Sequence, residues 1–372
     1  MRVTVYRSFC GELRTVWKEL EPFSQHHVFQ CYEWLSYWQQ TIGNRALYIR
    51  PHIVVVVGTD NQPRMIFPFG VRRQLGARVL GFLGGGQGDY QGPLIHDDWI
   101  SDAASISSAW SLVEKNLPGH DVRHFPKLPA YWCTSTNPML ALWTRTFQDN
   151  SYSSNLPASF ADFQEKLKPK LRADTRRQRR RLSEIGTLKF QVIDESDKHA
   201  LALDVMIEQK RQRYRNTGVP DILAHSAVQQ FYMELSNRFS GIGRIHFSVL
   251  MLNEEILATH WGAIHRDRFY FLMPTFAEGK WGGYSPGRLL LENLVEWCIQ
   301  NGLKVFDFTI GGEEYKKDWC DSEMPQFEHL RATTPLGLFY VGYILCLRRA
   351  RRNERMWALV KVLYGFFRYG KA

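Results

Sequence analysis

Apolar and polar positions alternate in blocks along this chain, and the order of the blocks predicts a mixed α/β protein. Three runs between residues 244 and 276 are rich in aromatic and β-branched side chains and predict strands. A Gly-rich turn follows, and the apolar residues from Leu290 to Cys298 then recur at helical spacing. The short run VFDFTI at 305–310 predicts one more buried strand.

The same order of blocks occurs once before in the chain. Three predicted strands between residues 52 and 86 precede a Pro/Gly turn, a helix near 102–115 and a strand near 120–125. We therefore expect an α/β (α+β) fold of two tandem units, each a mixed, mostly antiparallel sheet flanked by helices. The units are expected at residues 1–160 and 191–335.

An Arg-rich segment joins the two predicted units. Residues 161–190 include the run KLRADTRRQRRRL, which predicts a helix that Gly186 ends. Its arginines, Arg176 among them, suit either a solvated linker helix or a clamp on a phosphorylated ligand or an RNA backbone.

The net charge of +10 is concentrated in two places. Residues 165–190 carry ten Lys/Arg against three acids, and residues 348–372 carry eight against one. Each segment is therefore at +7, and the remainder of the chain sums to −4. This distribution argues against a generally basic surface that coats nucleic acid.

The second basic segment belongs to a tail at residues 336–372. An apolar run, LGLFYVGYILCL, precedes a cluster of arginines, and aromatic and aliphatic residues follow. This pattern suits an element on an anionic membrane surface, or a helix packed on the core with a charged outer face. Because neither a signal-peptide core nor a membrane-spanning run is present in the sequence, we expect a cytoplasmic protein, either free or peripheral on the inner membrane.

The six cysteines do not predict a metal site. No C-x-x-C pair occurs, and no set of Cys and His residues has zinc-site spacing. Free thiols in a reducing compartment and no bound metal are therefore expected. The adjacent pair His26 and His27 is expected at the surface.

The Gly-rich turn at residues 282–287 has the features of a phosphate site. Ser285 suits the N-cap position and Pro286 the first helical position. The free N–H groups of a helix start favour an anion, and Arg288 and Lys280 would add full charges. A capped helix without any ligand explains the same residues.

One familiar catalytic motif can be excluded at this turn. GYSPG at residues 283–287 fits the G-x-S-x-G nucleophile elbow, which uses the N–H of the residue after the serine. That residue is Pro286, which has no N–H. The sequence therefore excludes a serine hydrolase of this type.

Polar groups gather at and beyond the last predicted strand. Asp307 interrupts an apolar strand, where a carboxylate is costly to bury unless it is paired. A structural aspartate and a catalytic one both fit this position. After Gly311 and Gly312, the run EEYKKDW at 313–319 brings proton donors and acceptors into one turn, which would otherwise be a solvated charged turn.

The motif YSPG-x-LL, followed by G-x-x-x-F-D-F-x-x-G-x-E-x-YK-x-x-W, covers Ser285 to Trp319. It resembles the CelD-like branch of the GNAT acyltransferase superfamily, which is associated with bacterial cellulose and exopolysaccharide biosynthesis and is related to Fem-type aminoacyl transferases. Weaker similarity extends upstream to Lys170 and to the N-terminal GDYQGPLI and YEWLSYW. The resemblance implies an acyl-CoA donor and an N-terminal unit that is a degenerate GNAT-like copy.

The resemblance also implies where the donor binds. In GNAT-like proteins a splayed strand presents a backbone N–H to the thioester carbonyl, and here that strand contains Met273. The pyrophosphate of coenzyme A would lie at the helix start, against Gly283, Ser285, Gly287 and Arg288.

The sequence leaves several candidates for the residues that transfer protons. Asp307, His260 and Glu313 are the candidate bases, in that order, although a neutral His260 imidazole would be the more suitable base chemically. By analogy, Tyr315 would protonate the leaving thiolate. Lys316 would bind a phosphate or a substrate carboxylate.

The remaining expectations concern the acceptor. Asp89 and Tyr90, in the loop GGGQGDYQG at 84–92, would point toward the cleft that the two units share and would bind substrate there, together with Arg176.

Three functions remain open from the sequence. The first is an acyl-CoA-dependent N- or O-acyltransferase that acts without a covalent enzyme intermediate on a sugar or amino sugar of a bacterial surface polysaccharide, free or lipid-linked. The second is a Fem-like transferase that uses aminoacyl-tRNA. No long coiled-coil arm is present for tRNA, so nucleic acid is a partner only in this second case. The third is a non-catalytic scaffold of a polysaccharide-synthesis complex.

Overall fold

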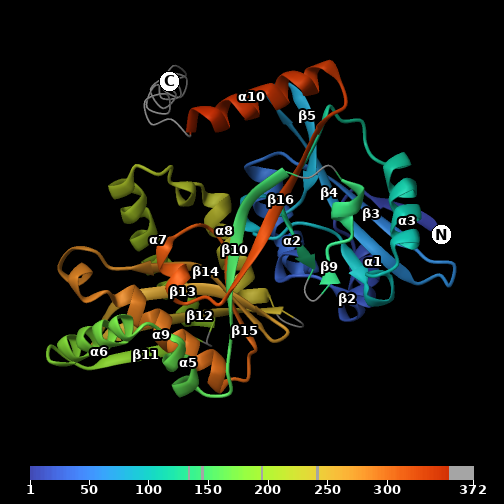
Figure 1. Cartoon of the computed structure of the whole chain (residues 1–372). Coiled ribbons are helices and arrows are strands. Elements are labelled where there is room, and N and C mark those ends of the chain that lie inside the picture. Colours follow the sequence, from blue (N-terminus) through green and yellow to red (C-terminus); the bar gives the residue numbers. More distant parts are fainter. Residues whose placement is uncertain (133–134, 144–145, 194–195, 240–242, 352–372) are drawn as a thin grey trace, which may run out of the picture.

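The computed structural model describes residues 1–132, 135–143, 146–193, 196–239 and 243–351. Within these residues one mixed sheet of 14 strands runs through the molecule, in the order β1-β3-β4-β5-β7-β16-β10-β15-β14-β13-β12-β11, with β6 and β2 joined at β4 (Figure 1). The strands are β1 (Arg2–Tyr6), β2 (Ser24–Gln25), β3 (Arg50–Val57), β4 (Pro63–Gln74), β5 (Ala77–Phe82), β6 (Leu94–His96), β7 (Val122–Pro129), β10 (Thr146–Asn155), β11 (Leu188–Val192), β12 (Gly243–Leu252), β13 (Glu255–His265), β14 (Arg268–Phe276), β15 (Val305–Ile310) and β16 (Ser322–Ala332). A separate hairpin consists of β8 (Tyr131–Trp132) and β9 (Ser135–Thr136).

Helices flank this sheet. They are α1 (Gly11–Leu20), α2 (Tyr32–Trp38), α3 (Ala103–Lys115), α4 (Met139–Leu142), α5 (Phe160–Lys166), α6 (Pro169–Ser183), α7 (Ser196–Thr217), α8 (Ser226–Arg238), α9 (Pro286–Gln300) and α10 (Pro335–Arg351). Two short 3₁₀ turns matter for the site, η7 (Gly279–Tyr284) and η8 (Glu314–Asp318).

The predicted repetition of the fold is confirmed. In the first copy, β3, β4 and β5 form an antiparallel meander, α3 follows, and β7 pairs parallel with β5. In the second copy, β12, β13 and β14 form the meander, α9 follows, and β15 pairs parallel with β14. Both copies are mixed, mostly antiparallel sheets with flanking helices, as the sequence analysis predicted.

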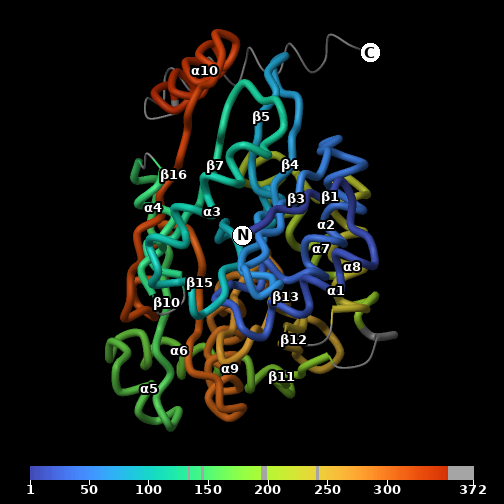
Figure 2. The backbone as a smooth tube through the Cα atoms, turned by 90° about the vertical axis from the view of Figure 1, so that its right-hand side faces the viewer, coloured from blue at the N-terminus to red at the C-terminus, as the bar shows by residue number. Residues whose placement is uncertain are grey.

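Two long strands cross between the copies. β10 precedes the Arg-rich segment in the chain but pairs with β15 of the second copy, whereas β16 follows the second copy and pairs with β7 of the first. β10 and β16 also pair with each other from Thr146 to Ser153, and they lie side by side in both views (Figures 1 and 2). The strands divide into two sets that are neighbours in the sheet. The N-terminal half-sheet consists of β1, β3, β4, β5, β7 and β16, with β2 and β6 joined to it, and the C-terminal half-sheet consists of β10, β15, β14, β13, β12 and β11.

The C-terminal half-sheet has a different core on each face. On one face, apolar residues of α9 such as Leu290 and Leu294 pack on Phe269 and Phe306, as the helical spacing of the sequence requires. On the other face, residues of α7 and α8 share a single core with α1 and α2 of the N-terminal half. This second core joins the two halves directly.

The Arg-rich segment folds as two helices, α5 and α6, rather than one. α6 begins at Pro169 and packs on α9 and on η7, with Thr175, Gln178 and Leu182 buried. Pro169 lies at the first helical position, which suits its fixed φ and missing N–H. The arginines of α6 are thereby brought beside the start of α9.

α10 packs on the N-terminal half-sheet through a narrow contact. Tyr340 is 1% exposed, and a Cβ on Gly337 would lie 1.9 Å from the Asp121 carbonyl oxygen, so only glycine fits there. Arg348 donates two hydrogen bonds to the Glu328 carboxylate, at 2.5 and 2.6 Å.

The outer side of α10 is apolar rather than charged. Leu338 and Phe339 are 67% and 65% exposed, and Leu345 is 53% exposed. The rest of the predicted tail, residues 352–372, lies outside the described residues. Among the residues that the structure describes, no helix combines the length and apolarity that a membrane span requires.

Candidate active site

Asp307 is the centre of a buried hydrogen-bond network between the two halves. Its carboxylate accepts from the Tyr90 hydroxyl at 2.8 Å, the Arg268 guanidinium at 2.9 Å and the Thr309 backbone N–H at 2.8 Å. Burial raises the pKa of Asp307, and the Arg268 charge opposes that effect. Because Asp307 is 0% exposed and uses both oxygens in these bonds, it is better placed to hold the two halves together than to take a proton from a substrate.

The network lies where two parallel strands separate. β14 pairs with β15 only from Arg268 to Tyr270, opposite Val305 to Asp307, although both strands continue further. Met273, which the resemblance implicates, lies three residues beyond the last pair, and its register partner is Trp261 on β13. The backbone of β14 from residue 271 onward therefore has no strand partner on the β15 side.

Backbone strain marks the same place. Thr309, on the β15 side of this opening, has a φ of 58°. That conformation is unfavourable for a β-branched residue and is found where surrounding structure enforces it, often at functional sites. Its N–H is the donor to Asp307, so the strained turn completes the network.

The start of α9 lies beyond the free part of β14. Pro286 occupies the first helical position as predicted, but the expected N-cap role of Ser285 is wrong. Ser285 adopts a left-handed conformation, with φ 52° and ψ 51°, and its side chain caps no backbone N–H. Its hydroxyl instead accepts from the Arg288 guanidinium at 3.3 Å.

The glycines of this turn differ in their surroundings. A Cβ on Gly287 would lie 3.0 Å from the Phe276 ring, whereas one on Gly283 would meet nothing within 4 Å. No hydrogen bond engages the Gly287 N–H among the described residues. Gly287 therefore has the free N–H donor that a phosphate site at a helix start needs, and the Phe276 ring leaves little room for a side chain at this position.

Cations that the sequence analysis missed face this region from α7. The Arg213 guanidinium lies 5.1 Å from the centroid of Phe276, the ring that abuts Gly287. Burial lowers the pKa of Lys210, one helical turn earlier, and Arg213 lowers it further while Glu313 opposes. The available signal was the i, i+3 spacing of Lys210 and Arg213 in KRQRYR.

Arginines of α6 and α9 complete the charged surroundings. Arg181 lies 4.5 Å from the centroid of the Tyr284 ring, directly before Ser285. Arg179 is already paired, with Glu292 at 2.8 Å. The predicted substrate residue Arg176 is exposed, and no hydrogen bond or ion pair engages it among the described residues.

The turn after β15 holds the acidic and phenolic groups. Glu313 has a side chain 59% exposed and forms an ion pair with Lys316 at 2.9 Å. Burial raises the pKa of Glu313, but the Lys316 hydrogen bond and charge outweigh it, so the net shift is downward and the group is a carboxylate at neutral pH. Burial and then the Glu313 charge raise the pKa of Tyr315, which keeps its proton. Lys316 is buried and also donates to the Ile310 carbonyl at 3.0 Å.

The structure argues against His260 as a base. Its ring is 0% exposed, stacks on Phe271 at 4.7 Å between centroids, and lies in the layer beneath α9. Neither ring nitrogen has a hydrogen-bond partner among the described residues, and burial lowers its pKa well below the ordinary value. A packing role fits these facts.

The prediction that His26 and His27 lie at the surface is wrong. Both side chains are buried, and each residue is 1% exposed. His27 Nδ1 lies 2.9 Å from the Tyr270 hydroxyl, and its ring lies 4.3 Å from that of Tyr90. His27 is thus part of the contact between the halves, beside Asp307. Adjacent histidines in an irregular segment carry no period from which burial can be read.

Asp89 lies at the same boundary. It forms an ion pair with Lys127 at 2.9 Å. Burial, then the Tyr214 hydroxyl and the Asp89 charge, raise the pKa of Tyr232 on α8, so Asp89 lies near residues of the C-terminal half. Asp89 and Tyr90 therefore both lie at the boundary between the halves, and their predicted role in substrate binding stays a prediction.

Comparison with known proteins agrees with this geometry. Residues 169–317 match a family model described as an acetyltransferase (GNAT) domain. This segment contains α6, the separated strands, the α9 start and Glu313. The matched segment is therefore similar to acetyltransferase domains of the GNAT type. No curated protein matches the sequence.

Solved structures extend the similarity to most of the chain. A crystal structure of FemX superposes with a TM-score of 0.58 at 11% identity, covering 88% of this chain and 97% of that one. A conserved protein of unknown function from Bacteroides thetaiotaomicron gives 0.55 at 11% identity, covering 88% and 99%. L-PGS from Bacillus licheniformis gives 0.52 at 11% identity, covering 90% and 96%. At this identity the likeness concerns the fold alone.

Proposed function

We propose that the protein is an acyl-CoA-dependent N- or O-acyltransferase that acts on a sugar or amino sugar in the assembly of a bacterial surface polysaccharide. The observation that carries the donor assignment is the separation of β14 from β15 beyond Tyr270, with the Gly-rich start of α9 beside it. An open strand edge supplies unpaired backbone donors, and a helix start supplies a site for phosphate.

In this proposal the pyrophosphate of coenzyme A binds the N–H groups that begin at Gly287. The guanidinium groups of Arg181, Arg213 and Arg288 lie around the turn and would neutralise phosphate charge. The thioester would follow the free edge of β14 to the region of Met273. A backbone N–H there would polarise the thioester carbonyl.

We assign proton transfer to Glu313, which is ionised and accessible, and to Tyr315, which carries its proton at neutral pH. An acceptor amine or hydroxyl attacks the thioester carbonyl carbon and gives its proton to the Glu313 carboxylate. The carbon–sulfur bond then breaks, and the departing thiolate takes the proton of the Tyr315 hydroxyl. Glu313 is the more accessible carboxylate, since its side chain is 59% exposed and that of Asp307 is fully buried.

Asp307 then acts as a positioning residue. It holds Thr309 in its strained conformation and ties β15 to Tyr90 in the other half. The acceptor would enter from this boundary, where the Asp89 carboxylate offers a hydrogen-bond acceptor for a polar ligand such as a sugar.

A Fem-like transferase that uses aminoacyl-tRNA is the second candidate. It is favoured by the superposition on nearly the whole FemX chain and by the exposed, unengaged Arg176 on α6. The two candidates differ in the donor, so the donor is the property to measure first.

The decisive experiment is calorimetric titration of the purified protein with acetyl-CoA, longer acyl-CoAs and aminoacyl-tRNA. Gly287→Asp should abolish acyl-CoA binding, because a carboxylate would occupy the phosphate site and its Cβ would press on Phe276. Gly11→Asp is the matched control, since it adds the same charge at the start of α1, where a Cβ meets nothing within 4 Å. Equal acyl-CoA affinity in both variants would refute the proposed donor site. Binding of aminoacyl-tRNA alone would favour the second candidate.

The proposal extends to an anionic membrane surface, where a lipid-linked acceptor would be found. The exposed apolar side chains of α10 lead into Arg348 and Arg349, a combination that suits the interface of an anionic bilayer. Only the inner side of α10 is used for packing on the core, so its outer side is available for this contact.

A further inference from the structure

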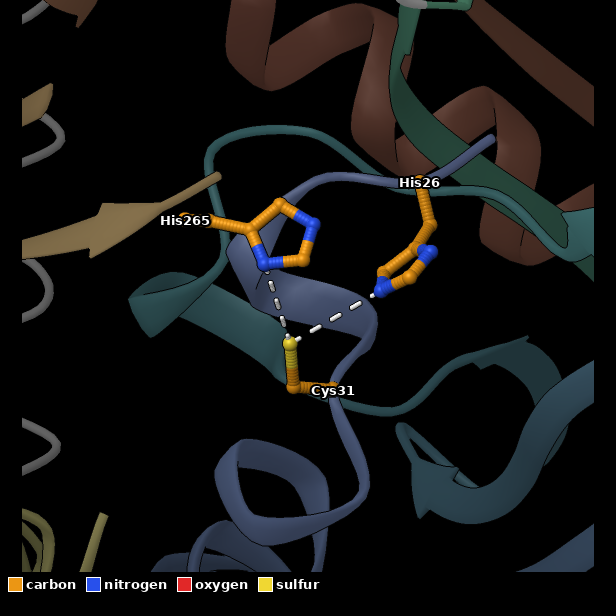
Figure 3. A group of neighbouring side chains, drawn as sticks. All are labelled: His26, Cys31 and His265. Atoms are coloured by element: carbon orange, nitrogen blue, oxygen red, sulfur yellow. Dashed lines mark hydrogen bonds between the residues drawn. The ribbon is translucent and has the colours of Figure 1, made fainter. Parts of the chain in front are cut away.

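A second cluster of reactive side chains lies apart from the proposed donor site. His26 and Cys31 come from the irregular segment that leads into α2, and His265 is the last residue of β13. All three are buried, at 1%, 1% and 3% exposure, and their side chains converge on one point (Figure 3). Their nearest ligand atoms all lie within 4.8 Å of one another.

The distances within the cluster fit a metal ion. Cys31 Sγ lies 3.8 Å from His26 Nε2 and 3.7 Å from His265 Nδ1. In a tetrahedral zinc site with ordinary Zn–S and Zn–N bonds, sulfur and nitrogen ligands are about 3.6 Å apart. The two sulfur–nitrogen separations therefore need only a small contraction, whereas the two nitrogens, within 4.8 Å of one another, would have to lie about 3.4 Å apart in a tetrahedral site.

The hydrogen bonds of His26 orient the ring for this role. Its Nδ1 lies 3.0 Å from both the backbone oxygen and the hydroxyl of Ser24. Donation from Nδ1 to the Ser24 carbonyl leaves the lone pair on Nε2, the atom that faces Cys31. Such an outer partner is the usual companion of a metal-binding histidine.

The charges around the cluster are mixed. Arg266 lies beside it and donates to the carbonyls of Glu21, Pro22 and Ser24. The Glu21 carboxylate is fully buried and accepts from the backbone N–H of Tyr32, the residue after Cys31.

We propose that His26 Nε2, Cys31 Sγ and His265 Nδ1 bind one Zn²⁺ ion that fastens the N-terminal half to the C-terminal half. The two nitrogens and one sulfur suit this borderline-soft cation. Binding releases the Cys31 thiol proton to solvent, forms a zinc–thiolate bond and involves no change of oxidation state. Water or a ligand would take the fourth position.

The proposal is tested on the full chain, expressed with zinc and measured by elemental analysis. We expect close to one zinc per wild-type chain and nearly none for Cys31→Ser. Cys10→Ser is the matched control, because Cys10 lies in the same half but outside the cluster.

Cobalt substitution and chelation give two independent readouts. The cobalt form should show a thiolate-to-cobalt charge-transfer band and intense tetrahedral visible bands, which Cys31→Ser loses. A chelator should lower the melting temperature of the wild type and of Cys10→Ser but not that of Cys31→Ser. Folded wild-type protein without stoichiometric zinc, or with a six-coordinate cobalt spectrum, would mean a hydrogen-bonded cluster only and would overturn the proposal.

Discussion

Replacing Asp307 by Asn should separate a structural role from a catalytic one. The amide keeps one oxygen for Tyr90 and Thr309 but turns an N–H₂ donor toward the Arg268 guanidinium, which is also a donor. The variant loses a charge-assisted hydrogen bond, worth about 1.5–3 kcal/mol, and removes the carboxylate charge beside the Arg268 guanidinium. Because the Arg268 side chain is 23% exposed and can regain some water, we expect a loss near the lower end of the 3–5 kcal/mol typical of a broken buried pair, about 3 kcal/mol.

The measurement is urea-induced unfolding followed by circular dichroism and tryptophan fluorescence. Tyr90→Phe should cost less, about 1.5 kcal/mol, because Asp307 keeps its bonds to Arg268 and Thr309. Asp98→Asn is the control: its carboxylate is 72% exposed, and surface ion pairs contribute about 1 kcal/mol at most. If Asp307→Asn unfolds at the wild-type urea concentration and yet loses all transfer activity, the positioning role is refuted and Asp307 becomes the base.

Three further predictions address other parts of the molecule. Glu313→Gln should lower kcat by about 10²-fold or more while leaving the acyl-CoA Kd unchanged; an unaltered kcat would remove Glu313 from the chemistry. The pKa of Glu328 lies at about 2 in the folded protein against 4.5 as its ordinary value, because its ion partners outweigh burial. Its contribution of about 3 kcal/mol is therefore complete above pH 4.5 and lost as the pH falls toward 2, and Glu328→Gln should abolish that acid-dependent loss in unfolding measurements. Replacing Leu338 and Phe339 together by Ser should weaken co-sedimentation with anionic vesicles on the order of 100-fold, and undiminished binding would show that α10 is not the membrane contact.

Strands whose side chains alternate between two buried faces were predicted well. The three strands predicted between residues 244 and 276 are β12, β13 and β14, and the one predicted at 305–310 is β15. Both faces of this half-sheet are covered, so the apolar runs are nearly continuous. The polar strand β10 contains no run of apolar residues, so its sequence did not predict a strand. Its sequence, TFQDNSYSSN, is held by backbone pairing to two neighbours, which composition does not reveal.

The candidate site also contains some features that the sequence predicted and others that it did not. The turn at the start of α9 was anticipated from local chemistry, whereas Tyr90 was predicted to bind substrate and instead bonds to Asp307. The burial of His260 and the approach of Arg213 to Phe276 depend on how α9 and α7 cover the sheet. Such contacts between distant segments have no period or spacing in the sequence, so residue type alone cannot decide between a base and a packing residue.

The crossing of β10 and β16 limits how the enzyme can move and how it can be divided. β10 comes from the first part of the chain but pairs within the C-terminal half, and β16 comes from the last part but pairs within the N-terminal half. A cut between α5 and α6 would therefore not release two independent folding units. Opening the halves like a hinge would also break a continuous ladder of backbone hydrogen bonds. Substrate entry must therefore rely on local rearrangement of helices and turns, and fragments produced separately should be insoluble until they are combined.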